Sequence, residues 1–251
     1  SNGGVSYSPV TSGANLLVAC PTGKYASASD TECAYTDAGY FASNAAGVSV
    51  TSAAVQQEPC GSGTYSIGTG NTVCTDATAG FYASNAEGSM NVASAAVIAT
   101  PCPTGKYNTA IQQTSCVDCA IGTYQAAVGS TLCEDVNAGY YASDDEAAEA
   151  IIGATSQTQC PCGRYQPATK STTCVLADRG KYTVTGATTQ ISVGPGYFAC
   201  TEDSAVTNNG DEPTPDLACA ACACQAGRYA VAESTECTSC PDGYSVAAGG
   251  G

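Results

Sequence analysis

Cysteine is the residue type in this sequence whose side chain is most able to carry out chemistry. Three cysteine pairs have Cys-x2-Cys spacing. That spacing is typical of thiol redox sites and of zinc ligands. In thioredoxin-type sites the motif begins a helix that follows a strand, and the residues around these pairs predict neither element. We therefore interpret the spacing as a boundary between repeats. The pairs are Cys116/Cys119, Cys219/Cys222 and Cys237/Cys240.

Zinc held by four thiolates is an alternative for Cys162, Cys219, Cys222 and Cys224. The chain contains 17 Cys and no His. A composition so rich in cysteine is typical of secreted proteins, whose cysteines form disulfides. We favour disulfides and expect no metal or other cofactor.

One acidic cluster and the lack of His also bear on the chemistry of the chain. Asp144, Asp145, Glu146 and Glu149 could bind Ca²⁺, but they lack the spaced ligands of a calcium loop, so a solvated acidic face is the favoured interpretation. The absence of His removes Ser-His and Cys-His catalysis. We expect no catalytic residues and no enzyme activity.

The composition predicts a protein held together by cross-links. There are no Trp and three Phe, and Ala and Cys supply much of the apolar fraction. Such a chain cannot build one large core, so disulfides must substitute for burial, as in small extracellular modules. We expect an extracellular or cell-surface location.

Charge and hydropathy exclude several classes of partner. The net charge is −15 with seven Lys and Arg, which disfavours nucleic acids and anionic membranes. No apolar run approaches the roughly 20 residues that span a bilayer. No Asn-x-Ser/Thr sequon occurs, whereas the Ser- and Thr-rich tracts are compatible with O-linked glycans.

The cysteines belong to a repeated unit, A, with the pattern Cys-x2-Gly-x-Tyr-x7–8-Cys. We predict that each A unit closes its own loop, which the chain-entropy model values at about 3 kcal/mol for roughly 15 residues. The predicted pairs are Cys20–Cys33, Cys60–Cys74, Cys102–Cys116, Cys119–Cys133, Cys160–Cys174 and Cys224–Cys237.

A second unit, B, begins with Gly-aromatic-aromatic-Ala-Ser or Gly-Tyr-Phe-Ala-Cys, and tracts such as Val48–Ser52 follow it. These tracts predict short, exposed strands because Val and Thr alternate with small polar residues. The last B unit carries a turn-rich acidic loop over Asn208–Asp216. The B units start at Gly39, Gly80, Gly139 and Gly196.

One segment has the A pattern without its cysteines. Gly180 and Tyr182 are in register, while Ala177 stands at the opening position and Ile191 at the expected closing position, 14 residues later. The joint loss of both cysteines is what a bonded pair would show. We also expect the A-unit tyrosine to cover the bridge of its own loop.

Five cysteines remain outside the A pairs. Cys162, Cys200, Cys219 and Cys222 make an even set with three pairings, and we favour a bridge from Cys200 to the Cys219/Cys222 end. Cys240 opens a further unit, Cys240–Tyr244, that the given sequence does not complete. It is either orphaned by truncation or bonded to another subunit.

The units follow the order AB, AB, AAB, AAB, A and a partial A. This order predicts an elongated tandem-repeat rod of small disulfide-rich modules, mostly β and loop, without one large core. The segments are 1–19 (tail of a B repeat), 20–59 (AB), 60–101 (AB), 102–159 (AAB), 160–223 (AAB with a cysteine-less second A and a long acidic loop) and 224–251 (A plus the partial A).

Two families have similar motifs. Cys102-Pro-Thr-Gly-Lys-Tyr107 resembles the opening of the short modules in tumour-necrosis-factor-receptor-type domains, and Phe81–Ser84 and Tyr140–Ser143 resemble elements of ciliate immobilisation antigens. The first three B units lack the further cysteines that both families usually carry there. The resemblance implies a cysteine-rich extracellular repeat protein.

We therefore expect a structural protein outside the cell, either a surface coat or a head-to-tail filament or appendage. The partial repeats at both ends fit either self-association or continuation in a longer repeat chain. The alternative is a receptor or adhesion ectodomain that presents loops to a protein or glycan ligand.

Overall fold

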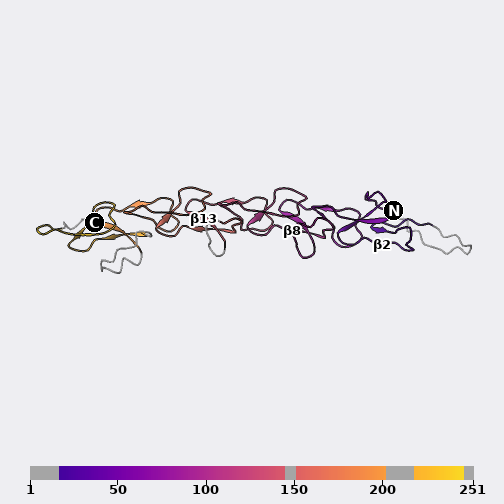
Figure 1. Cartoon of the computed structure of the whole chain (residues 1–251), viewed down its shortest axis with the longest axis horizontal. Helices are drawn as coiled ribbons and strands as arrows, with labels where there is room; N and C mark the ends of the chain where they lie inside the picture. The colour runs from indigo at the N-terminus through magenta and orange to yellow at the C-terminus, as the bar shows by residue number, and fades with distance from the viewer. Residues whose placement is uncertain (1–16, 145–150, 202–217, 246–251) are drawn as a thin grey trace, which may run out of the picture. The chain divides into compact units, whose positions relative to one another are not determined.

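The computed structural model describes residues 17–144, 151–201 and 218–245. Within these residues the regular structure is entirely β: 22 short strands form eleven two-stranded sheets (Figure 1). No membrane-spanning helix is found among them. The opening B tail up to residue 16, the acidic residues 145–149 and the loop 208–216 lie outside the described residues.

Seven sheets are narrow hairpins with strands of two residues, and we call them A hairpins. Gly-x-Tyr places the tyrosine at the end of the first strand, where the chain then widens into the loop. They are β1 (Lys24–Tyr25) with β2 (Ala34–Tyr35), β5 (Thr64–Tyr65) with β6 (Thr75–Asp76), β9 (Lys106–Tyr107) with β10 (Val117–Asp118), β11 (Thr123–Tyr124) with β12 (Glu134–Asp135), β15 (Arg164–Tyr165) with β16 (Val175–Leu176), β17 (Lys181–Tyr182) with β18 (Ile191–Ser192), and β21 (Arg228–Tyr229) with β22 (Thr238–Ser239).

Four sheets are hairpins with strands of four residues, which we call B hairpins. The Gly-aromatic-aromatic-Ala-Ser/Cys motif supplies the first strand, and the residues directly before the next A cysteine supply the second. They are β3 (Tyr40–Ser43) with β4 (Gln56–Pro59), β7 (Phe81–Ser84) with β8 (Ile98–Pro101), β13 (Tyr140–Ser143) with β14 (Ser156–Gln159), and β19 (Tyr197–Cys200) with β20 (Ala220–Ala223).

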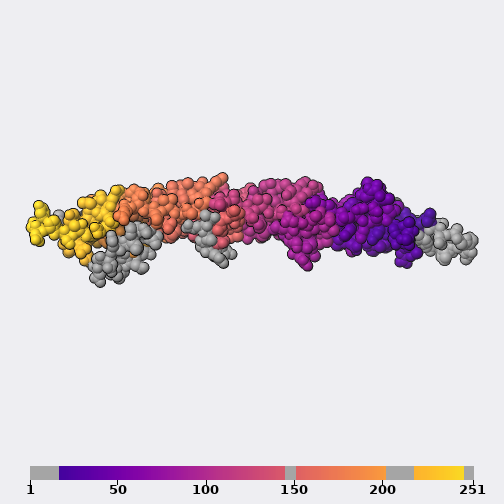
Figure 2. Space-filling model, viewed as in Figure 1, coloured from indigo at the N-terminus to yellow at the C-terminus, as the bar shows by residue number. Residues whose placement is uncertain are grey.

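Contacts group the chain into two units. Unit 1 comprises Ser1–Pro103, Tyr107–Val117 and Val128–Thr131, and unit 2 comprises Thr104–Lys106, Asp118–Ala127 and Leu132–Gly251. Unit 1 contains β1 to β8 and unit 2 contains β11 to β22. In Figure 2 the colours of each unit follow one another in chain order, because each hairpin packs on hairpins near it in sequence.

A and B hairpins begin with the same turn. A glycine precedes the first strand with φ between 73° and 84°, and we call it the turn glycine. At Gly63 a Cβ would overlap the carbonyl oxygen of Gln112, and at Gly80 it would overlap that of Gly129. Only glycine combines this φ with so close a backbone approach. The partner carbonyl belongs in each case to the hairpin two places further along the chain.

The residue three places before the turn glycine is also equivalent in the two hairpin types. In A hairpins it is a half-cystine such as Cys60, except in β17–β18, where it is Ala177. In the four B hairpins it is Thr36, Ala77, Val136 or Val193. Cys60 and these four B-hairpin side chains are at most 2% exposed. The carbonyl of this residue accepts a hydrogen bond from the next hairpin, as in Ala95 N–H to Cys60 O (2.8 Å) and Gln112 N–H to Ala77 O (2.8 Å).

The donors of these hydrogen bonds all have positive φ. Among the described residues they link nine hairpins to the preceding one, and the carbonyls of all these donors except Ala53 face turn glycines. The donor–acceptor pairs are Ala53–Cys20, Gly70–Thr36, Ala95–Cys60, Gln112–Ala77, Gly129–Cys102, Gly153–Cys119, Lys170–Val136, Gly186–Cys160 and Glu233–Val193.

Apolar packing is confined to small clusters between hairpins. In unit 1, Ala77, Ala83 and Ala96 are buried, with Tyr65 packed against them. In unit 2, Val136, Ala142 and Ala154 form the equivalent cluster. Small side chains allow the backbones to approach and leave hydrogen bonds and disulfides as the main connections.

The structure corrects the expectation that the tracts of the B units form exposed strands. The tract Val48–Ser52 is not a strand, and Ser49 forms only an isolated β-bridge with Ser43. The strands of the B hairpin lie on either side of this tract, and Ala42 and Ser43 of the first strand are fully buried. The B unit is therefore a stacked hairpin equivalent to A.

The tyrosine of an A hairpin also has a different neighbour from the one expected. Tyr65 and Tyr124 pack on the alanine- and valine-based clusters. The ring that packs against Cys160 and Cys174 is Tyr141, from the preceding B hairpin. The Cys160–Cys174 disulfide is thus packed against a ring of the neighbouring hairpin.

Candidate functional site

The most chemically distinctive groups of the structure are its eight disulfides. Six of them close A hairpins with Cα–Cα separations of 5.7 to 5.8 Å, and they join the cysteines that the spacing pairs. Each encloses 13 or 14 residues of sequence separation. They are Cys20–Cys33, Cys60–Cys74, Cys102–Cys116, Cys119–Cys133, Cys160–Cys174 and Cys224–Cys237.

Two further bridges lie in unit 2. Cys200–Cys222 links the two strands of the fourth B hairpin, and Cys162–Cys219 has a sequence separation of 57. Cys240 has a free thiol. Cys219, Cys222, Cys224 and Cys162 are all disulfide-bonded, so their sulfurs cannot act as zinc thiolates. Groups of metal-binding side chains are not found among the described residues.

The Cys-x2-Cys pairs do not form bridges within themselves. Cys116 and Cys119 belong to adjacent hairpins and bond to Cys102 and Cys133. The pair Cys116/Cys119 therefore marks the end of one hairpin and the start of the next. Cys219 and Cys222 also bond to other cysteines, Cys162 and Cys200, but both belong to the second half of the β19–β20 hairpin, so this pair is not a boundary between hairpins.

The long-range bridge Cys162–Cys219 flanks the cysteine-less hairpin β17–β18. Gly163 N–H donates to Thr183 O (3.2 Å), and Thr183 N–H donates to Ala218 O (3.1 Å). The Thr183 hydroxyl donates to Arg164 O (2.9 Å). Both bridging cysteines are thus next to residues that hydrogen-bond Thr183, which is fully buried.

The closing position of β17–β18 differs from the one expected. Tyr182 pairs with Ile191, whereas in β15–β16 Tyr165 pairs with Val175, the residue after Cys174. The residue equivalent to the closing cysteine is therefore Gln190, and the loop is one residue shorter than the alignment to Ile191 implies.

Gln190 makes a polar contact that joins the ends of this loop. Its Oε1 accepts from Asp178 N–H (2.8 Å), and its Nε2 donates to the Asp178 carboxylate. These hydrogen bonds, first from Gln190 and then from Lys181, together with the Lys181 charge, lower the pKa of Asp178. We call this arrangement the glutamine clamp.

The glutamine clamp recurs in two B hairpins, which also lack an A-type disulfide. Gln57 accepts from Asp37 N–H and donates to its carboxylate, both at 2.8 Å. Gln157 accepts from Asn137 N–H (2.9 Å). In all three hairpins the clamped residue lies two places before the turn glycine. The cysteine and glycine spacing does not predict this contact, because Gln57 and Gln157 lie within the second strand of their hairpins whereas Gln190 stands directly before it.

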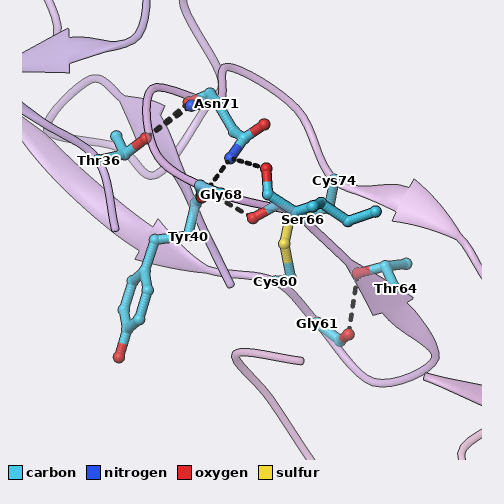
Figure 3. The surroundings of a disulfide bond; sticks show 10 residues. Thr36, Tyr40, Cys60, Gly61, Thr64, Ser66, Gly68, Asn71 and Cys74 are labelled. Atoms are coloured by element: carbon cyan, nitrogen blue, oxygen red, sulfur yellow. Dashed lines mark hydrogen bonds between the residues drawn. A yellow bond between two sulfur atoms is a disulfide. The ribbon is translucent and has the colours of Figure 1, made fainter. Parts of the chain in front are cut away.

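Polar side chains next to the bridges also connect neighbouring hairpins. Around Cys60–Cys74, the Thr36 hydroxyl accepts from Asn71 N–H (2.8 Å), and the Ser66 hydroxyl donates to Tyr40 O (3.1 Å) (Figure 3). Asn71 additionally donates to Gly68 O (2.9 Å) within its own loop. These groups are occupied by internal hydrogen bonds, so the surroundings of the bridge are structural in character.

The acidic cluster is only partly described. Asp144 lies within the described residues, while Asp145, Glu146 and Glu149 lie outside them. The interpretation as a solvated acidic face stays a prediction.

Comparisons with known proteins do not identify a relative. Neither the protein-family models nor the curated proteins contain a match to this chain. The resemblance to immobilisation antigens and receptor modules therefore rests on the short motifs alone.

Proposed function

We propose that this protein is a non-enzymatic structural component of an extracellular coat, filament or appendage, and that it associates with itself head to tail. The observation that carries this proposal is that the thiols and many polar groups of the protein are bonded to one another within the structure. The described cysteines other than Cys240 are disulfide-bonded, and the buried hydroxyls and amides described above connect one hairpin to the next. Such an arrangement supports a structural role.

The compartment follows from the same bonds. Eight disulfides are typical of a cysteine-rich protein of an oxidising compartment. Placement at the cell surface, in a coat or in a filament goes further and belongs to the proposal.

Sedimentation and electron microscopy of the oxidised protein test self-association, together with electrophoresis in reducing and non-reducing gels. We expect particles that lengthen with protein concentration. A monomer in both gels together with isolated particles at every concentration would contradict the proposal.

A receptor or adhesion ectodomain is the second candidate, and the fourth B hairpin favours it. Unlike the other three B hairpins, β19–β20 carries two disulfides with partners outside the A pattern. Binding of the oxidised protein to a glycan array or to cell-surface protein would support this candidate if the double variant Cys200→Ala/Cys222→Ala lost the binding.

A further inference from the structure

We propose that one copy of this chain completes a B hairpin of a second copy: the segment Leu17–Ala19 pairs as a β-strand with Gly243–Ser245 of the neighbouring molecule. The inference rests on the proposed self-association and specifies its contact. It is a case of β-augmentation, in which main-chain hydrogen bonds supply the affinity.

The first observation concerns the residues before Cys20. In each described B hairpin, the second strand ends directly before a cysteine whose N–H donates to the turn glycine of that hairpin. Leu17–Ala19 hold this position before Cys20 but form no strand, and Leu17 is 99% exposed. The four regular contacts are Cys60 to Gly39 (2.7 Å), Cys102 to Gly80 (2.8 Å), Cys160 to Gly139 (2.8 Å) and Cys224 to Gly196 (2.9 Å).

The second observation concerns the other half of a hairpin, at Gly243. Gly243 has φ 86°, and Tyr244 N–H donates to Pro241 O (3.1 Å), as Tyr40 N–H does to Asp37 O (3.1 Å). Cys240 N–H donates to Gly227 O (3.0 Å), which seats this turn on the preceding hairpin. The turn is therefore formed, while Tyr244 is 77% exposed and no strand partner is described for it.

This half-hairpin combines features of both types. Tyr244 directly follows its glycine, as Tyr40 follows Gly39, while Cys240 stands three places before that glycine, as in A hairpins. The spacing after the glycine is the one of a B hairpin, and we build the proposed pairing on it. A B hairpin needs a second strand that ends directly before a cysteine, and Leu17–Ala19 is such a segment.

The register follows from the complete B hairpins. Tyr40 lies opposite Pro59 and Phe41 opposite Glu58, which places Tyr244 opposite Ala19 and Ser245 opposite Val18. Hydrogen-bonded and non-hydrogen-bonded pairs alternate along an antiparallel ladder. Because Cys60 bonds to Gly39, the Tyr40–Pro59 pair is non-hydrogen-bonded, which a proline tolerates. By the same alternation, Val18 is expected to donate a hydrogen bond and Ala19 is not.

We take a second copy of this chain as the binding partner because the two halves of the hairpin, Leu17–Ala19 and Gly243–Ser245, are complementary and both are present in this sequence. Leu17 and Val18 also provide apolar side chains that would be covered on pairing. Both copies carry a net charge of −15, so association is expected to strengthen as salt screens their repulsion.

Cross-linking tests the register directly. In a Cys240→Ser background, a chain with Ala19→Cys is mixed with a chain with Tyr244→Cys and oxidised. We expect a covalent dimer, because opposite residues of a non-hydrogen-bonded pair are within disulfide reach. The matched control is Val18→Cys mixed with Tyr244→Cys, since Val18 points to the other face of the strand. Equal yields for the two mixtures, or no dimer in either, would overturn the proposed register.

Two proline variants test the strand itself. Val18→Pro removes the expected donor and should raise the dissociation constant by about tenfold or more, which corresponds to about 1.4 kcal/mol. Ala19→Pro should associate like the unmodified chain, because Pro59 and Pro101 occupy the same position in complete hairpins. Circular dichroism checks that both variants fold.

The outcomes separate this inference from the function on which it rests. If the unmodified chain assembles and Val18→Pro assembles equally well, the strand pairing is wrong while self-association stands. If the unmodified chain stays monomeric at all concentrations and salt levels, both proposals fall.

Discussion

The neighbouring hairpins β15–β16 and β17–β18 have the same turn and pairing, yet one is closed by a disulfide and the other is not. Cys160–Cys174 closes the first. In the second, the glutamine clamp joins Gln190, at the closing position, to Asp178, the residue after the opening position Ala177. A disulfide stabilises mainly by restricting the unfolded chain, whereas the glutamine clamp acts only in the folded one. The comparison shows that the hairpin geometry does not depend on the covalent bond.

The bridge Cys162–Cys219 explains how the cysteine-less hairpin remains in place. Its sequence separation of 57 encloses the whole of β17–β18. The hairpin is therefore restrained from outside, by a bridge between its two neighbours, as well as by its own hydrogen bonds to Gly163 and Ala218.

Removal of this long-range bridge should give the largest effect. For Cys162→Ser/Cys219→Ala, the chain-entropy model predicts a loss of about 4 kcal/mol, because a closed loop of that length restricts the unfolded chain strongly. Hydrogen exchange should show a loss of amide protection first at Thr183 and Val193. The control is Cys200→Ala/Cys222→Ala, which removes a bridge that does not enclose β17–β18. Unchanged protection at Thr183 would contradict the role of the bridge.

A disulfide introduced into β17–β18 should give this hairpin the covalent closure that β15–β16 has. Ala177→Cys/Gln190→Cys closes a loop of the same length as Cys20–Cys33, which is worth about 3 kcal/mol before the lost glutamine clamp is subtracted. Peptide mass spectrometry identifies the bond, and urea unfolding of oxidised and reduced protein gives its effect. The control Ala177→Cys/Ile191→Cys should remain reduced or bond poorly. A better bond in the control would show that the register is wrong.

Removing the glutamine clamp should have a smaller effect. Gln190→Ala should lower the local opening free energy of β17–β18 by less than the loss of a disulfide would, because hydrogen bonds exposed to water are largely replaced by bonds to water. Hydrogen exchange at Val193, whose N–H donates to Gly180 O (3.1 Å), reports on this hairpin. Gln157→Ala should weaken the β13–β14 hairpin by a similar amount. An effect in neither hairpin would mean that the glutamine clamp does not stabilise them.

The smallest effect is expected from pH. Because the pKa of Asp178 is lowered in the folded hairpin, its contribution is present above the ordinary aspartate pKa of about 3.9 and is lost as the pH falls through the lowered value. Protection of β17–β18 should therefore fall below about pH 4. Asp178→Asn should remove this pH dependence and keep the amide contact, since Asn137 makes the same contact with Gln157. If the pH dependence of protection is unchanged in Asp178→Asn, a group other than Asp178 causes it.

The repeated cysteine spacing was sufficient to predict the A bridges, because each pair is local in sequence and surrounds the same Gly-x-Tyr motif. The B hairpins were harder to predict. Their second strands, such as Gln56–Pro59 and Ala220–Ala223, share little sequence, and their pairing depends on position before a cysteine rather than on residue type. Gln190 was missed because loop length was assumed constant, and only the Tyr182–Ile191 pairing shows that this loop is shorter.

The sequence by itself determined the fold class and the A bridges, since local loop closure and the turn glycines require only nearby residues. Tertiary structure decided that A and B are one kind of hairpin. That equivalence depends on stacking: Thr36, Ala77, Val136 and Val193 fill the buried position that a half-cystine fills in A, and their carbonyls accept the same hydrogen bond. A hydrogen bond between backbone atoms of two hairpins leaves no residue-type signature, so only the three-dimensional arrangement reveals it.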